Sequence, residues 1–481
     1  MNSTQHCASL SHSKKLLAAG VVGVALAIAP ALALADGGAT PAPIAQASDA
    51  PAPAPTLAPG LLGDWGGSRE SLAQKGITVY GGITDEAATM LNGGNRSGTA
   101  NAGQFAIGTN IDFGQLNPGS GAGTLHFLFT QRYGSSLATN SLGSLISVQE
   151  IYGAGLTDRL SELDYAQPLF DNKLNVEFGR VVMQNDFITG GTYWGQSVYC
   201  LYQNNGFCGT GDGVPNNSGW GYAPTSQWGA RVKFTPSGSF YMTAGGYQVN
   251  PVYGLSGQGF NLSTNGDTGM MFPFETGAVL RNKDGAKVGD VSVGGYYDTS
   301  NVLNYESYLS KFVAPNNPAL TAVPQTFQRG RDGAWFQFDH LLSGSAAPGQ
   351  PGTMFFTTYE FGDPQTALFS SFVDAGIARH GTFAGRPNDI LAFGYTYNNI
   401  NPRLRTFEQE LQGAGYAVPL NGVEQALELN YSAQLTPWLV LRPGIQYVMN
   451  PSGESYNVNY PGGIVGPKNG LVFGLGTGIT F

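Results

Sequence analysis

The stretch Asn469-Gly-Leu-Val-Phe-Gly-Leu-Gly-Thr-Gly-Ile-Thr-Phe481 ends the sequence and decides the fold. Apolar side chains fall on one parity, that of Leu471, Phe473 and Phe481, while the other parity holds mainly small or polar residues. Because a strand repeats every two residues, this pattern predicts a strand with one apolar face. A terminal strand of this kind, ending in an aromatic residue, is typical of bacterial outer-membrane barrels. The last strand of a soluble β-sandwich would show the same alternation.

Strand-like runs recur along most of the chain. About sixteen are recognisable, an even number in the range of porins. Their apolar parity would face lipid and their polar parity would line water. They start near residues 77, 102, 121, 157, 172, 223, 238, 270, 286, 330, 351, 366, 390, 423, 437 and 469.

The connections between these runs alternate in length. Several are tight turns, such as Asn282-Lys-Asp-Gly285 and Thr436-Pro437. Short turns at one rim and long loops at the other are the plan of an outer-membrane barrel, with the short turns periplasmic, and a soluble sandwich has no reason to alternate in this way. We therefore predict an all-β fold, a transmembrane antiparallel β-barrel of about 16 strands. The long links are 133–156, 184–222, 251–269, 299–329, 399–422 and 449–468.

The N-terminal region precedes the barrel. Lys14 and Lys15, an apolar run and an Ala-Leu-Ala site predict a signal peptide over residues 1–35. Residues 36–60 are rich in Ala and Pro and predict an extended periplasmic linker. Residues 61–76 are expected to form a short helical segment, with the helix near 68–74, and the barrel to cover 77–481.

Composition narrows the class of partner. The 481 residues include 70 Gly and only 11% charged residues, which suits a curved sheet with a lipid-facing outside. The formal net charge of −9 becomes −11 once Lys14 and Lys15 leave with the signal peptide. This sign argues against nucleic acid and against a phosphate-selective pore. No nucleotide-binding loop, cofactor motif or Ser-His-acid arrangement is evident, so we expect neither a cofactor nor an enzyme.

Polar residues on the inward parity are candidates for pore lining and sugar binding. Arginine and carboxylate pairs hydrogen-bond vicinal hydroxyls, and Trp faces stack on sugar C–H surfaces. For any one of these residues, solvating the pore wall is the alternative role. The candidates are Arg132, Asp164, Arg231, Trp335, Asp339, Glu424, Glu428 and Arg442.

Arg180 does not fit this alternation, because it shares parity with lipid-facing residues. A charge there is costly, so we hypothesise that Gly179 forms a bulge and turns Arg180 inward at the narrow zone of the pore.

The longest predicted loop, 184–222, contains Trp194, Cys200, Cys208 and several amides. Two cysteines in an exported protein favour a disulfide, and neither has a nearby His for a metal site. Clustered aromatics predict a constriction folded into the lumen, with an ordinary surface loop as the alternative.

The block Leu62-Gly-Asp-Trp-Gly-Gly-Ser-Arg69, followed by Leu72 and Gly76, strongly resembles the N-terminal hallmark of the OprB family of carbohydrate-selective porins. Blocks at 163–167, 176–180, 424–431 and 439–447 resemble later parts of that family, so the resemblance covers residues 61–481. It implies a sixteen-stranded barrel with a short helix at its periplasmic end, passing glucose and related sugars by facilitated diffusion.

We therefore expect a Gram-negative outer-membrane porin for mono- and small oligosaccharides. The alternatives are a general diffusion porin without sugar preference and, from another class, an outer-membrane hydrolase or structural barrel. Outer-membrane lipid and the barrel assembly machinery, through the C-terminal strand, are expected partners, and a homotrimer is compatible with the sequence.

Overall fold

The computed structural model describes residues 60–208, 213–304, 307, 326–413, 420–453 and 466–481. The predicted signal peptide and all of the predicted linker except Gly60 lie outside these residues.

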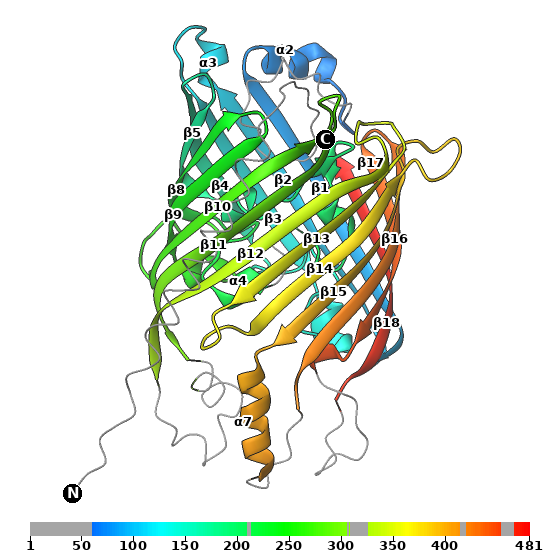
Figure 1. Cartoon of the computed structure of the whole chain (residues 1–481). Coiled ribbons are helices and arrows are strands. Elements are labelled where there is room, and N and C mark those ends of the chain that lie inside the picture. The colour runs from blue at the N-terminus through cyan, green and yellow to red at the C-terminus, as the bar shows by residue number, and fades with distance from the viewer. Residues whose placement is uncertain (1–59, 209–212, 305–306, 308–325, 414–419, 454–465) are drawn as a thin grey trace, which may run out of the picture.

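In the described part of the chain, sixteen antiparallel strands form one closed barrel, in which β1 pairs with both β2 and β18 (Figure 1). This confirms the predicted fold class, and each strand begins within a few residues of its predicted start. The strands are β1 (Ile77–Gly94), β2 (Thr99–Asp112), β3 (Thr124–Gly134), β4 (Asp158–Leu169), β5 (Leu174–Val181), β8 (Gln227–Ser237), β9 (Phe240–Val249), β10 (Gly269–Arg281), β11 (Lys287–Leu303), β12 (Phe327–Gly344), β13 (Gly352–Gly362), β14 (Phe369–His380), β15 (Ile390–Ile400), β16 (Val423–Thr436), β17 (Leu439–Met449) and β18 (Lys468–Thr480).

The two rims of the barrel differ. Figure 1 places α2, α3 and the C-terminus at one end and α7 at the opposite end. The first end carries the short turns and is periplasmic by the outer-membrane plan. No helix among the described residues is long and apolar enough to cross a membrane. The helices in the connections other than the two that enter the lumen, together with the N-terminal ones, are η2 (Trp65–Gly67), α2 (Ser68–Gln74), α3 (Phe113–Leu116), η6 (Pro251–Gly254), α7 (Pro402–Gly413) and η8 (Pro451–Gly453).

The N-terminal segment docks on the end of the last strand. Helix α2 has the predicted bounds, and Gly76 follows it with φ of 90°. The Arg69 guanidinium donates a 2.7 Å hydrogen bond to the main-chain oxygen of Phe481. The Leu61 N–H donates to Thr480, and Phe481 N–H donates to Gly81 of β1. The segment therefore seals the seam between β1 and β18 at the periplasmic end.

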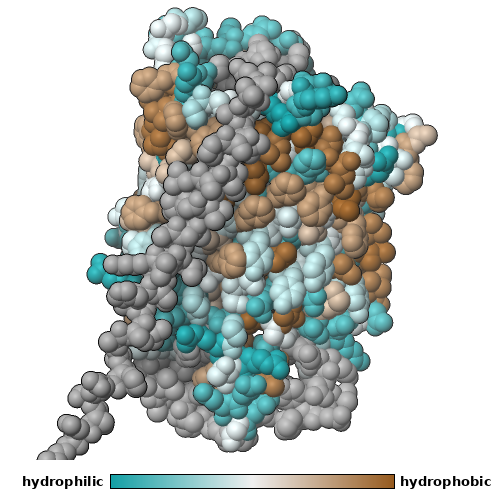
Figure 2. All heavy atoms as spheres, viewed as in Figure 1, coloured by the Kyte–Doolittle hydropathy of each residue, from teal (hydrophilic) through white to brown (hydrophobic). Residues whose placement is uncertain are grey.

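The outer wall of the barrel is apolar. Phe178, Phe336, Leu429 and Ile445 are exposed there, on the parity predicted to face lipid. Figure 2 shows hydrophobic side chains gathered between two more hydrophilic ends, as a bilayer-spanning surface requires.

The hydrophobic core lies inside the barrel, where two connections enter the lumen. We call the described residues 182–208 and 213–226, between β5 and β8, the long inner loop, and residues 135–157, between β3 and β4, the short inner loop. The long inner loop packs on apolar side chains of β9 to β15, and the short inner loop on those of β1, β2 and β16 to β18. The inner loops contain η3 (Ala138–Leu142) and η4 (Met183–Asn185), β6 (Thr192–Tyr193), β7 (Gln196–Ser197), η5 (Tyr199–Leu201) and α4 (Gly213–Asn217).

Candidate functional site

The long inner loop crosses the lumen, as the sequence predicted. Its disulfide between Cys200 and Cys208 is present, with an S–S distance of 2.02 Å. The Tyr199 hydroxyl donates to the main chain of Phe338 on β12, and the Tyr202 hydroxyl donates to Phe393 on β15. The loop is therefore fastened to the far wall of the barrel, and it narrows the pore.

Carboxylates of the wall accept main-chain N–H groups of this loop. The two oxygens of Glu428 on β16 each accept a 2.8 Å hydrogen bond, from the N–H groups of Gln203 and Asn204. Asp339 on β12 accepts from Gly191 at 2.9 Å. Because these carboxylates are buried, their hydrogen bonds to the loop also satisfy charges that would otherwise be costly in the lumen.

The short inner loop is held in the same way. Glu424 on β16 accepts from the N–H groups of Leu145 and Ile146, at 2.8 and 2.9 Å. The two inner loops also bond to each other, since the Glu150 N–H donates to the Gln203 carbonyl at 2.8 Å. The loops thus form one constriction rather than two independent flaps.

Arg132 joins this constriction to the wall. Its Nε donates to Gln104 at 2.9 Å, and its terminal nitrogens donate to the carbonyls of Gly153 and Ala223, both at 3.3 Å. These two carbonyls belong to the short and the long inner loop, so one guanidinium fixes both. A planar fork with five donors suits this role better than an ammonium group would.

Opposite charges gather around Glu150 of the short inner loop. Burial raises the pKa of the Glu150 carboxyl, while the nearby guanidinium groups of Arg132 and Arg442 oppose that rise. Arg442 on β17 is only partly buried, and its Nε donates to Ser432 at 2.9 Å. Both guanidinium groups therefore lie within electrostatic reach of this carboxylate.

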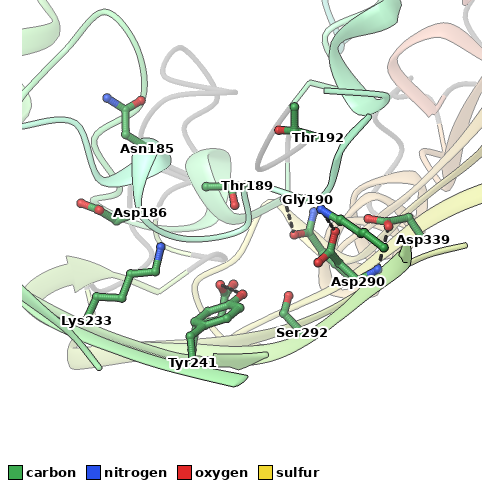
Figure 3. A pocket seen from close by; sticks show the side chains of 13 residues that line it. Asn185, Asp186, Thr189, Gly190, Thr192, Lys233, Tyr241, Asp290, Ser292 and Asp339 are labelled. Atoms are coloured by element: carbon green, nitrogen blue, oxygen red, sulfur yellow. Dashed lines mark hydrogen bonds and ion pairs between the residues drawn. The ribbon is translucent and has the colours of Figure 1, made fainter. Parts of the chain in front are cut away.

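Under the long inner loop, a cavity lies against strands β8 to β12 (Figure 3). Thr189 and Gly190 of the loop face Lys233, Tyr241 and Asp290 of the wall. The predicted candidate Asp339 lies at its edge and also accepts from the Tyr193 hydroxyl. The cavity belongs to the periplasmic half, because its wall residues lie near the short turns.

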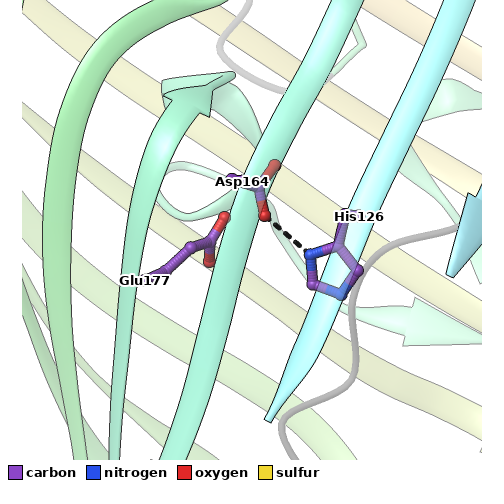
Figure 4. A group of neighbouring side chains, drawn as sticks. All are labelled: His126, Asp164 and Glu177. Carbon is purple, nitrogen blue, oxygen red and sulfur yellow. Dashed lines mark hydrogen bonds and ion pairs between the residues drawn. The ribbon is translucent and has the colours of Figure 1, made fainter. Parts of the chain in front are cut away.

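A second polar cluster lies on the adjacent strands β3, β4 and β5, beside β8 (Figure 4). His126, Asp164 and Glu177 offer ligand atoms within 4.8 Å of one another, the donor types that a divalent metal prefers. Each is engaged already, however: His126 Nδ1 lies 2.7 Å from Asp164, and Glu177 lies 2.6 Å from Arg231. Arg231 also pairs with Asp186 of the long inner loop at 2.6 Å. We interpret the cluster as an ion-pair network of the pore wall.

The two candidate tryptophans are covered. Trp335 is 1% exposed; its Nε1 donates to Glu275 at 2.7 Å, and its ring packs edge-on against Trp220 of the long inner loop. Trp194 is 6% exposed and stacks on the ring of His380. Their ring faces hold the loop against the wall.

The predicted bulge at Gly179 is wrong. Pairing of β5 with β4 and with β8 runs through Gly179 and Arg180 without a register shift. Arg180 therefore keeps the outward parity of Phe178. It is nevertheless buried, because the β9–β10 connection covers it, with its guanidinium carbon 3.9 Å from the Tyr253 ring centroid. A covering loop, rather than a bulge, buries the outward-facing charge of Arg180.

Sequence reasoning missed several residues that hold the constriction. Glu275 accepts from the Ile188 N–H and from Trp335, and Glu86 accepts from the Ile151 N–H. The sequence signal that could have found them is the number of carboxylates on the inward parity, which is larger than a neutral solute needs.

Comparison with known proteins identifies the family to which this barrel belongs. The family model described as carbohydrate-selective porin, OprB family, matches residues 96–481. The chain belongs to this family.

Individual relatives agree with the family match. The chain is 30% identical over 413 residues to Porin B of Pseudomonas aeruginosa, covering 82% of this chain and 87% of that protein. It is 30% identical over 420 residues to the putative porin QuiX of Acinetobacter baylyi, covering 82% and 89%. The high-pH structure of Pseudomonas putida OprB has a TM-score of 0.77 at 28% identity and covers 88% of this chain and 99% of that one.

As a member of the OprB family, the protein is a sugar-selective porin of the Gram-negative outer membrane and not an enzyme. The barrel, its apolar outer wall and its narrowed lumen are the structural basis of that role.

Proposed function

We propose that glucose and related mono- and small oligosaccharides cross the lumen beside the two inner loops, and that Arg132, Glu150 and Arg442 contact the sugar at the narrowest part. The observations that support this proposal are that Arg132 donates to carbonyls of both inner loops and that the Glu150 carboxyl lies within electrostatic reach of both guanidinium groups. A polyol exchanges hydrogen bonds with water for hydrogen bonds with such groups and needs no net charge.

A narrow, fixed constriction favours selectivity over general diffusion. The cross-linked long inner loop and its carboxylate anchors leave little freedom for the lumen to widen. Conduction requires contacts strong enough to admit a solute and weak enough to release it. Transport on this basis is passive and follows the sugar gradient.

The test is single-channel conductance of the purified protein in lipid bilayers, with glucose, maltose and a neutral amino acid titrated into the salt solution. We expect both sugars to block the current at millimolar concentrations and the amino acid not to. Current indifferent to all three solutes would instead support a general diffusion porin.

A variant of Arg442 tests whether this side chain contacts the sugar. Arg442→Gln removes a charge at the constriction while leaving the anchors of both loops in place, so we expect weaker block by glucose. Arg379→Gln, at an exposed position of β14, is the matched control and should match the parent protein. Equal block in all three proteins would exclude Arg442 from the sugar path.

Two expectations about partners belong to the same proposal. Recognition by the barrel assembly machinery would use β18, whose Phe473 and Leu475 are exposed on the outer wall. A homotrimer would be tested by the mass of the detergent-solubilised protein.

A further inference from the structure

The cavity under the long inner loop has a volume of about 180 Å³. At about 30 Å³ per water molecule this is the space of roughly six waters, which is room for one sugar ring. Lys233 lies five residues before the β8–β9 turn, and Lys287 directly follows the β10–β11 turn. The cavity therefore lies in the periplasmic half of the barrel.

Its lining alternates donors and acceptors. Lys287 Nζ lies 2.5 Å from Asp290, and the Tyr193 hydroxyl donates to the same carboxylate at 2.9 Å. Thr189 of the long inner loop points into the cavity, and its hydroxyl makes no hydrogen bond to any described residue. Ser292 faces it from β11 (Figure 3). The cavity thus presents hydroxyl, ammonium and carboxylate groups to one small ligand.

This chemistry favours a neutral polyol. An anion would meet the carboxylates of Asp290 and Asp339, and a simple cation would have to displace Lys287 from its ion pair. A sugar hydroxyl donates to a carboxylate and accepts from an ammonium or hydroxyl group without adding charge. Burying no new charge avoids the desolvation cost that an ion would bring.

We propose that this cavity is a second saccharide subsite, which takes one monosaccharide as it leaves the constriction on the periplasmic side. The inference rests on the proposed sugar path and adds a site to it. Two weak sites in sequence let a solute pass in short steps, as multi-site pores do.

The test measures glucose block of single-channel current with the sugar on one side only. Two variants alter the cavity: Thr189→Trp fills it, and Lys287→Met removes one donor. For glucose added on the short-turn side, we expect the half-blocking concentration to rise about three- to tenfold, the size expected for a lost hydrogen bond. For glucose added on the long-loop side, we expect less than about a twofold change, since the constriction is intact. Lys283→Met, at an exposed position of the β10–β11 turn, is the matched control and should leave both values unchanged.

The outcomes separate the two proposals. Block of the parent protein from both sides, with both variants unchanged, would overturn the subsite and leave the sugar path standing. An equal rise from both sides would also overturn it, because the variants would then have disturbed the constriction itself. Absence of glucose block in the parent protein would overturn the sugar path and the subsite together.

Discussion

The replacement Glu428→Gln tests whether the wall carboxylates hold the constriction in place. In the parent protein, the two oxygens of Glu428 each accept a main-chain N–H of the long inner loop at 2.8 Å, and one also accepts from Asn430. A glutamine has one acceptor oxygen, so its amide N–H₂ must face one of these donors. One charge-assisted hydrogen bond is lost and one buried N–H is left without its acceptor.

The loss is about 2 kcal/mol, within the 1.5–3 kcal/mol of a hydrogen bond to a charged group. At a factor of ten for each 1.4 kcal/mol, it shifts the balance between seated and released loop about thirtyfold. The Asn204 side chain still bonds to Gln446, and the disulfide is intact, so only the tip of the loop is freed. We expect a foldable barrel with greater open-channel noise and weaker glucose block.

The assay is single-channel recording in planar bilayers, with the heat-dependent shift of the barrel on SDS gels as the check of folding. Glu410→Gln, at an exposed position of α7, is the matched control. If Glu428→Gln and Glu410→Gln both give the noise and glucose block of the parent protein, the carboxylate does not hold the loop.

Three further changes test other contacts. Arg69→Ala removes the hydrogen bond to Phe481, so we expect a lower unfolding temperature by circular dichroism; identical melting curves would contradict the seam-sealing role. Burial raises the pKa of Asp389, in the β14–β15 turn, but hydrogen bonds from Arg386 and other donors outweigh it and hold this pKa below its ordinary value. The stabilisation is therefore present at neutral pH and lost as pH falls through the folded-state pKa, below about 3.9. Asp389→Asn should have a lower melting temperature than the parent protein at pH 7 and the same melting temperature at acid pH. A difference in melting temperature that stays constant with pH would contradict this. Cys200→Ser should raise open-channel noise but leave the gel shift of the barrel unchanged, because the strands carry the barrel's hydrogen bonds; an earlier gel shift would contradict this.

The strands were predictable because one physical rule repeats along the chain. In β16, Leu427 and Leu429 face outward, and Glu424 and Glu428 face inward. This period of two residues does not depend on which partner each side chain contacts. Strand ends followed from turn residues, and helix α2 followed from its short polar run and Gly76. Topology then followed from the alternation of short and long connections, since antiparallel neighbours join most simply by short turns.

The role of each inward side chain was not predictable in the same way. Periodicity gives the direction of Glu428 but not its partner, which lies more than two hundred residues away on a loop without a period. Trp335 was correctly placed inside, but the loop that covers it could not be positioned from sequence. Arg180 shows the same limit, because a distant connection rather than its own strand buries it.

The anchoring contacts have a consequence for selectivity. A carboxylate that accepts two loop N–H groups, as Glu424 and Glu428 do, has little acceptor capacity left for a passing hydroxyl. The number of carboxylates that face inward is therefore larger than the number of groups that can contact a sugar. The groups that keep capacity for a sugar include Arg442 at the constriction and Thr189 at the periplasmic cavity, both of which are only partly buried. If discrimination among sugars is set there, it depends on a few side chains held by a rigid frame, and the anchors contribute by fixing the distance between those side chains.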